Sequence, residues 1–158
     1  MRQLSLQAES GKRVSMGCDI HAYVEVKIHG KWQLYSHLRL ERDYHLFARM
    51  ANVRNYYGIE AIDEPRGLPA DISEMTRFCR DYDGADGHSD SYLSGAEVDA
   101  LCTWQDKQRV AECKDDKWYS FEHSQVGYIF GNGWDVKKYP DSYPKGVEDA
   151  RLVFWFDN

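Results

Sequence analysis

The pattern Asp-x-His occurs twice in this chain, as Asp19 with His21 and as Asp86 with His88. A carboxylate and an imidazole two residues apart project to the same side of an extended segment. Two such pairs would supply four ligands to one zinc, manganese or iron ion, or acid and base groups to one cleft. We therefore predict that these four side chains converge in one polar site, as ligands of a divalent metal cofactor or as catalytic groups. The structural alternative is that they only hydrogen-bond within turns and the sheet.

A second set of polar side chains has the chemistry to hold an anion. Arginine binds phosphate or carboxylate through two parallel hydrogen bonds. Arg66 is the most suggestive of the set, because Pro65 and Pro69 restrict its loop. Its structural alternative is an arginine that ties loop carbonyl groups together. The predicted ligand-binding residues are Arg42, Arg54, Asn55, Arg66 and Ser89.

Cys18 stands next to Asp19 and three residues before His21, an arrangement that would suit a thiolate nucleophile. Neighbouring residues of a strand point to opposite faces, so Cys18 should turn away from both. We therefore expect a buried and inert thiol.

Two segments have the patterns of β-strands. From Ile20 to Ile28, apolar residues alternate with more polar ones, and residues 31–36 return after the dipeptide His29-Gly30. This pattern predicts a β-hairpin. The segment 151–156 is apolar on both faces, which is typical of a strand in the middle of a sheet. We predict that this C-terminal strand lies beside the first strand.

Three segments have the periodicity or the start signals of short helices. The first shows an apolar stripe at helical spacing. The other two begin with the spacing of a capping box, an acceptor side chain followed three residues later by glutamate. The predicted helices lie near 45–55, 72–80 and 95–104, and the capping pairs are Asp71 with Glu74 and Ser94 with Glu97.

Together these elements predict an α+β fold, with one mainly antiparallel sheet and about three short helices packed on it. Residues 1–15 are polar and aperiodic, so we expect a flexible N-terminal arm ahead of a single globular domain, 16–158. Two further elements are less regular, a short strand over 118–121 and a strand or buried turn over 125–130.

Composition narrows the classes of function. The formal net charge is −6, so direct nucleic-acid binding is not expected. No apolar run approaches the roughly 20 residues of a membrane-spanning helix, and the N-terminus lacks the apolar core of a signal peptide. The four cysteines lie far apart without a C-x-x-C pair, which is typical of free thiols in a reducing compartment. We therefore expect a cytoplasmic protein without a membrane partner.

The chain contains six short sequence motifs: GCDIH at 17–21, RDYHLFA at 42–48, VRN at 53–55, PRGLPADIS at 65–73, DGHS at 86–89 and FWFDN at 154–158. Together they resemble a family of small uncharacterised proteins encoded by bacteriophages and prophages. The resemblance covers roughly residues 16–100 and the C-terminal tail. It implies a phage-encoded protein that works in the bacterial cytoplasm. Small phage accessory proteins often manipulate host nucleotides or block host defence by binding one of its components, and this association suggests a role but no mechanism.

Two functions follow from these residues. In the first, the protein recognises a nucleotide or another phosphorylated small molecule. Arg54 and Arg66 would hold phosphate, and a bound metal would activate water for phosphoester hydrolysis; whether turnover occurs is left open. In the second, the protein is a non-enzymatic inhibitor that binds a host defence protein through an aromatic surface. The aromatic residues considered for that surface are Trp118, Tyr119, Trp134, Tyr139 and Tyr143.

Overall fold

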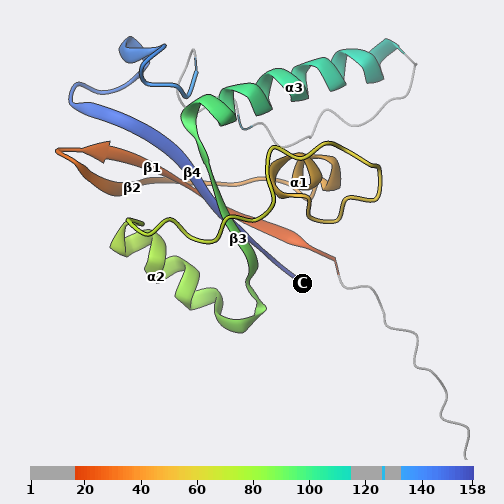
Figure 1. The fold of residues 1–158 in the computed structure, drawn as a ribbon, viewed down its shortest axis with the longest axis horizontal. Coiled ribbons are helices and arrows are strands. Elements are labelled where there is room, and N and C mark those ends of the chain that lie inside the picture. Colours follow the sequence, from red (N-terminus) through yellow and green to blue (C-terminus); the bar gives the residue numbers. More distant parts are fainter. Residues whose placement is uncertain (1–16, 115–125, 127–132) are drawn as a thin grey trace, which may run out of the picture.

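The computed structural model describes residues 17–114, 126 and 133–158. Within them, four strands form one sheet in the order β2-β1-β4-β3, and every neighbouring pair is antiparallel. The sheet and its three α-helices confirm the predicted α+β fold (Figure 1). The elements in chain order are β1 (Asp19–Ile28), β2 (Lys31–Leu38), α1 (Tyr44–Ala51), α2 (Glu74–Asp83), the 3-10 turn η1 (Gly84–Asp86), β3 (His88–Ser94), α3 (Gly95–Lys114), the 3-10 turn η3 (Pro140–Ser142) and β4 (Val147–Asp157).

The C-terminal strand β4 is central and pairs with β1 along its length, from Asp19 opposite Asp157 onward. The predicted neighbourhood of the two strands is therefore confirmed. The predicted hairpin of β1 and β2 is confirmed as well. It turns at His29 and Gly30, whose φ angles are 50° and 73°. Positive φ at both central residues is what a two-residue hairpin turn of the right twist requires.

One face of the sheet forms the main core with α1 and α3. Even-numbered residues of β1 and β4 point to this face, and Ile20 lies opposite Phe156. Phe47 of α1 packs edge-on against Phe156, with ring centroids 5.1 Å apart. Val98 and Leu101 of α3 are fully buried. Removal of these large apolar side chains from water is the main favourable contribution to folding.

The opposite face carries a more polar layer, and α2 covers it. In Figure 1, α1 and α3 lie above the strands and α2 lies below them. Tyr23 of β1 stacks on Trp155 of β4 and on His37 of β2, at centroid distances of 5.0 and 4.7 Å. The two faces of the sheet therefore have different chemistry, and a side chain's face decides which groups it can meet.

All three helices end at residues that differ from the prediction, and α2 ends at Asp83 rather than near 80. α1 ends at Ala51 rather than near 55, because Asn52 adopts a left-handed φ of 56° and caps the helix. α3 continues to Lys114 rather than to about 104. Its extension, QDKQRVAECK, consists mostly of residues with good helix propensity.

One of the two predicted capping boxes is confirmed. The backbone N–H of Glu97 donates to Ser94 Oγ at 3.3 Å, and the carboxylate of Glu97 accepts from the N–H of Ser94 at 2.9 Å. The prediction for Asp71 is wrong, since Ser73 is the residue whose side chain accepts from the N–H of Thr76 at the start of α2. Asp71 lies outside the helix and is bound elsewhere.

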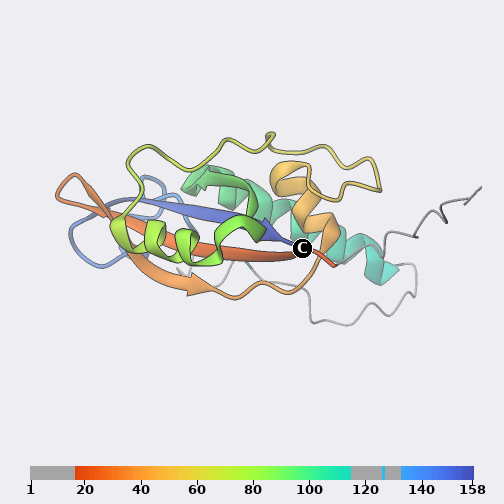
Figure 2. The same cartoon turned by 90° about the horizontal axis from the view of Figure 1, so that it is seen from below.

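The long connection between α1 and α2 crosses the outer edge of β3 (Figures 1 and 2). The backbone N–H of Gly67 donates to the carbonyl oxygen of Asp90 at 2.8 Å, and that of Arg66 donates to Ser91 Oγ at 3.2 Å. These bonds occupy polar groups that an edge strand would otherwise expose. They also hold Arg66 beside β3 and the start of α3.

Three sequence predictions lie outside the described residues. They are the flexible arm 1–15, the short strand over 118–121 and, apart from Val126, the element over 125–130. Among the described residues, no helix has the length and apolar character needed to cross a membrane.

Candidate functional site

Asp19 and His21 both have partners within the chain. Asp19 accepts two hydrogen bonds of 2.8 Å from Nε and Nη2 of Arg42, and this contact lowers the pKa of the carboxyl group. Nε2 of His21 lies 2.9 Å from Oδ2 of Asp157, and Nδ1 lies 3.6 Å from Oδ2 of Asp83. Both ring nitrogens of His21 therefore face carboxylates of the chain itself.

Asp86 and His88 lie elsewhere. Asp86 is exposed in η1. The ring of His88 stacks on Phe156, on the α1 face of the sheet, whereas His21 stacks on Trp155, on the α2 face. Because successive strand residues point to opposite faces, the sheet separates the two histidines. The predicted convergence in one cleft is therefore wrong, and among the described residues no group of three or more His, Cys, Asp or Glu could hold a metal ion.

The predicted ligand-binding residues are also engaged within the chain. Arg54 donates to the side-chain oxygen of Asn158 at 2.8 Å. Asn55 closes its own loop by accepting from the N–H of Ile59 at 2.9 Å. The hydroxyl of Ser89 lies 3.0 Å from the imidazole of the preceding histidine. These contacts are spread over the sheet and its loops and do not converge on one anion site.

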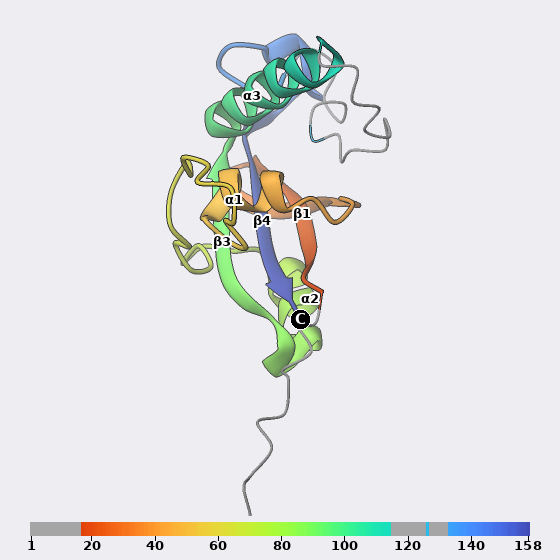
Figure 3. The same cartoon turned by 90° about the vertical axis from the view of Figure 1, so that its right-hand side faces the viewer.

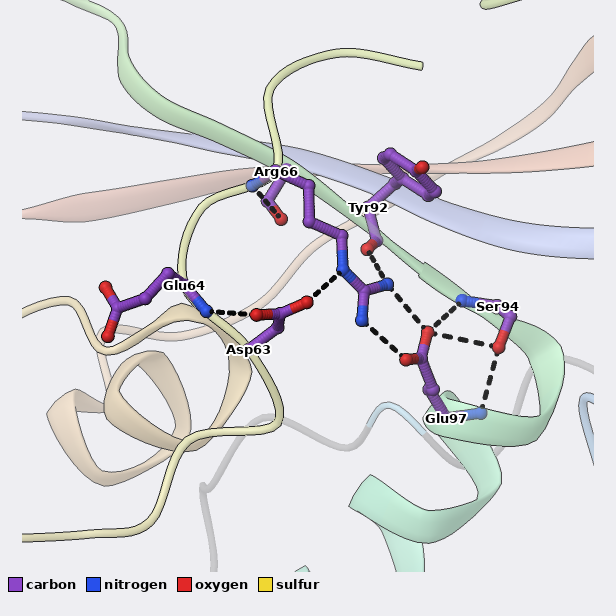
Figure 4. Close-up of polar contacts among 7 residues, drawn as sticks. Asp63, Glu64, Arg66, Tyr92, Ser94 and Glu97 are labelled. Atoms are coloured by element: carbon purple, nitrogen blue, oxygen red, sulfur yellow. Dashed lines mark hydrogen bonds and ion pairs between the residues drawn. The ribbon is translucent and has the colours of Figure 1, made fainter.

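Arg66 is the centre of a clamp that joins three segments (Figure 4). Its Nε donates to Asp63 at 2.9 Å, and Nη1 and Nη2 donate to the two carboxylate oxygens of Glu97 at 2.9 and 2.6 Å. Nη1 also donates to the carbonyl oxygen of Tyr92 at 3.0 Å. The geometry matches the structural alternative for this residue, because the loop directs the guanidinium toward the start of α3.

Replacement of Arg66 should therefore affect stability. We expect Arg66→Ala to lower the free energy of unfolding by about 1–3 kcal/mol, since Glu97 loses its charged partner and the carbonyl oxygen of Tyr92 loses its arginine donor. Arg66→Lys should recover only part of this, because lysine lacks the two-pronged geometry. Urea unfolding monitored by circular dichroism measures both variants. Unchanged unfolding of Arg66→Ala would refute the clamp.

The same pair makes stability depend on pH. The guanidinium of Arg66 lowers the pKa of Glu97 from 4.5 to about 2, against the opposing effect of burial. A carboxyl whose pKa is lowered by folding stabilises the protein above its ordinary pKa and loses this contribution as the pH falls toward the lowered value. Between about pH 4.5 and pH 2, the wild-type protein should lose roughly 1–3 kcal/mol more stability than Glu97→Gln. Equal pH slopes in the two proteins would contradict this.

A buried charge network joins the sheet to the start of α2, and the sequence analysis missed it. Glu25, which is 0% exposed, accepts from Arg151 Nε at 2.8 Å and from the backbone N–H of Ser73 at 2.9 Å. Arg151 also donates to Asp71 at 2.7 Å and lies over the ring of Trp32 at 3.9 Å. The sequence does contain one signal for this network, because Glu25 and Arg151 carry opposite charges and lie in two strands that are predicted to be neighbours. The network fixes the N-terminus of α2.

Polar contacts also hold the C-terminal half of α2. Asp83 accepts from Nε1 of Trp155 at 2.7 Å. Arg80 donates to Asp90 at 2.6 Å and to two carbonyl oxygens of the following loop at 3.0 and 2.9 Å. Figure 3 shows this end of α2 beside the C-terminal end of β4. The helix is thus attached at both ends, although Thr76 is its one buried residue.

The large apolar side chains of α2 point away from the protein. Met75, Phe78 and Tyr82 are 58%, 65% and 84% exposed, and their i, i+3, i+7 spacing places them in one stripe, which we call the α2 stripe. Within the described part of the chain, none of the three makes a ring contact or a side-chain hydrogen bond, whereas the exposed Tyr56 and Tyr57 both contact neighbouring rings. A helix on a sheet usually turns its apolar stripe inward. An outward stripe is typical of an interaction surface.

The α2 stripe differs from the aromatic surface that was considered from the sequence. Trp134 is fully buried and Tyr143 is 8% exposed, and the hydroxyl of Tyr143 donates to the carbonyl oxygen of Trp134 at 2.6 Å. Tyr139 is half-buried. Trp118 and Tyr119 lie outside the described residues. Trp134 and Tyr143 therefore belong to the core and do not form a docking surface.

Comparisons of the chain with protein-family models, with curated proteins and with solved structures gave no match. The function must therefore be inferred from the geometry of the chain itself. Among the described residues, the α2 stripe is the feature with the clearest character of an interaction site.

Proposed function

We propose that this protein is a non-catalytic binding factor that docks on a protein of a bacterial host cell through the α2 stripe. The observation that carries the proposal is the reversed orientation of α2. Its inward side is attached by hydrogen bonds and ion pairs, and Met75, Phe78 and Tyr82 face solvent. Anchors at i, i+3 and i+7 are the pattern by which one helix binds an apolar groove.

Two physical arguments favour protein binding over other uses of this surface. Aromatic side chains that enter a partner's pocket supply much of the affinity of protein interfaces. A helix already formed and attached at both ends loses little conformational entropy when it binds. The resemblance to phage-encoded proteins supports a host partner, with components of host defence as the first candidates.

The other expected function, recognition or hydrolysis of a phosphorylated ligand, receives no support from the geometry. The guanidinium groups of Arg42 and Arg66 are paired with carboxylates of the chain, and Arg54 is bonded to neutral oxygens. No observation in the described residues favours that function over protein binding.

The test is retention of host proteins by the immobilised full chain. We expect a bacterial protein to be retained by the wild type and lost with Phe78→Asp. Tyr57→Asp is the matched control, since Tyr57 is similarly exposed, at 60% against 65%, and lies beside α1. The proposal fails if Phe78→Asp retains the same proteins as the wild type, or if the purified chain turns over phosphoesters.

A further inference from the structure

The α2 stripe has one charged border. In heptad terms Met75, Phe78 and Tyr82 occupy positions a, d and a, and Glu74 and Asp81 both occupy the flanking position g. Both carboxylates belong to exposed residues, and within the described part of the chain neither makes a side-chain hydrogen bond or an ion pair. The apolar stripe is therefore edged by two carboxylates that form no ion pair within the described residues.

The other border of the α2 stripe is uncharged and faces the sheet. Cys79 occupies the opposite flanking position and is partly buried, next to Tyr23 of β1, whose pKa is raised to about 12 by burial and by the neighbouring Cys79 and Asp83. The basic Arg77 occupies position c, three residues after Glu74 and four before Asp81, so it lies behind the acidic border on the side away from the stripe. A partner helix would therefore meet charge along one side only, where the two carboxylates lie nearer to the stripe than Arg77 does.

This pattern argues against a second copy of the chain as the occupant. In an antiparallel pair of α2 helices, the same flank of each helix meets the other, so Glu74 would face Asp81 of the second copy. Like charges in facing positions oppose association. In a parallel pair, the carboxylates would face Cys79, which offers no countercharge.

We propose that the natural occupant of the α2 stripe is a basic amphipathic helix of the partner protein, with apolar residues on its seam and lysine or arginine along the border that meets Glu74 and Asp81. This inference rests on the proposed function and specifies the class of partner. The overall charge of −6 adds long-range attraction for such a helix and speeds its encounter.

Two synthetic helical peptides of about three heptads test the inference, with leucine at a and d in both and lysine or glutamate at e and g. Isotope-labelled full chain is titrated with each peptide while amide resonances are recorded. We expect the lysine peptide to shift resonances of residues 74–83 and to bind more than about tenfold tighter than its glutamate twin.

Variants separate the stripe from general charge attraction. Phe78→Ala with Tyr82→Ala should weaken the lysine peptide by about tenfold or more at unchanged net charge. Glu74→Lys with Asp81→Lys should reverse the preference toward the glutamate peptide. Glu60→Lys, which changes an exposed carboxylate in the connection after α1, should leave the preference intact.

The inference is overturned if the lysine peptide does not bind, if both peptides bind equally, or if Glu60→Lys changes the preference as much as the α2 charge reversals do. If the peptide experiment fails but Phe78→Asp still abolishes retention of a host protein, the basic-helix partner is refuted and the proposed function stands. If the retention experiment fails as well, both proposals are refuted.

Discussion

Glu25→Ala should destabilise the protein by about 3–5 kcal/mol, the range expected when one partner of a buried ion pair is removed. Glu25 is 0% exposed and Arg151 is 5% exposed, so the remaining guanidinium would be buried with part of its countercharge missing. The N–H of Ser73 would also lose its acceptor. Chemical unfolding followed by circular dichroism and tryptophan fluorescence measures the change.

A double replacement separates the unpaired charge from lost packing. Glu25→Leu with Arg151→Met removes both charges and keeps apolar volume, so it should cost clearly less than Glu25→Ala. If the double variant is as unstable as the single variant, the shape of this site, rather than its charge balance, determines stability.

Phe78→Asp should remove partner binding while leaving the fold intact. Phe78 is 65% exposed, and exposed substitutions usually change the free energy of unfolding by no more than about 0.5 kcal/mol. A central aromatic anchor of an interface contributes about 2–4 kcal/mol of affinity, which corresponds to a loss of roughly 30-fold to 1000-fold in Kd. Calorimetry of the retained host protein against both variants gives the ratio.

The control for this prediction is Tyr57→Asp, which places the same charge on another exposed aromatic position. It should leave Kd within about twofold of the wild-type value, because a substitution outside the interface changes little. A large drop in the stability of Phe78→Asp would show that the side chain contributes to the fold, contrary to its exposure.

Much of the fold could be predicted because its signals are local. The alternation from Ile20 to Ile28 and the doubly apolar segment 151–156 identified two neighbouring strands, and Ser94 with Glu97 identified the start of α3. Local signals do not reveal which residue caps a helix when two candidate residues lie close together in the sequence. The choice of Ser73 over Asp71 at α2 depends on Arg151, which is 80 residues further along the chain.

The site could not be predicted, because its determinants are long-range. A stripe such as Met75, Phe78 and Tyr82 looks like the core-facing side of a helix, and the sequence does not tell which way it will turn. In α2 the orientation is set by Asp83 bonding to Trp155 and by Ser73 bonding to Glu25. His21 and His88, the histidines of the two Asp-x-His motifs, are likewise separated, because their strands present them to opposite faces of the sheet.

Site-specific photo-crosslinking tests the role of α2 most directly. A photoreactive phenylalanine analogue is placed at position 78 in the full chain, or at position 57 as the matched exposed control, and the protein is irradiated in bacterial host lysate. We expect a covalent adduct with one host protein from position 78, suppressed by excess wild-type chain, and no such adduct from position 57. Equal adducts from both positions, or none from position 78, would contradict docking through the α2 stripe.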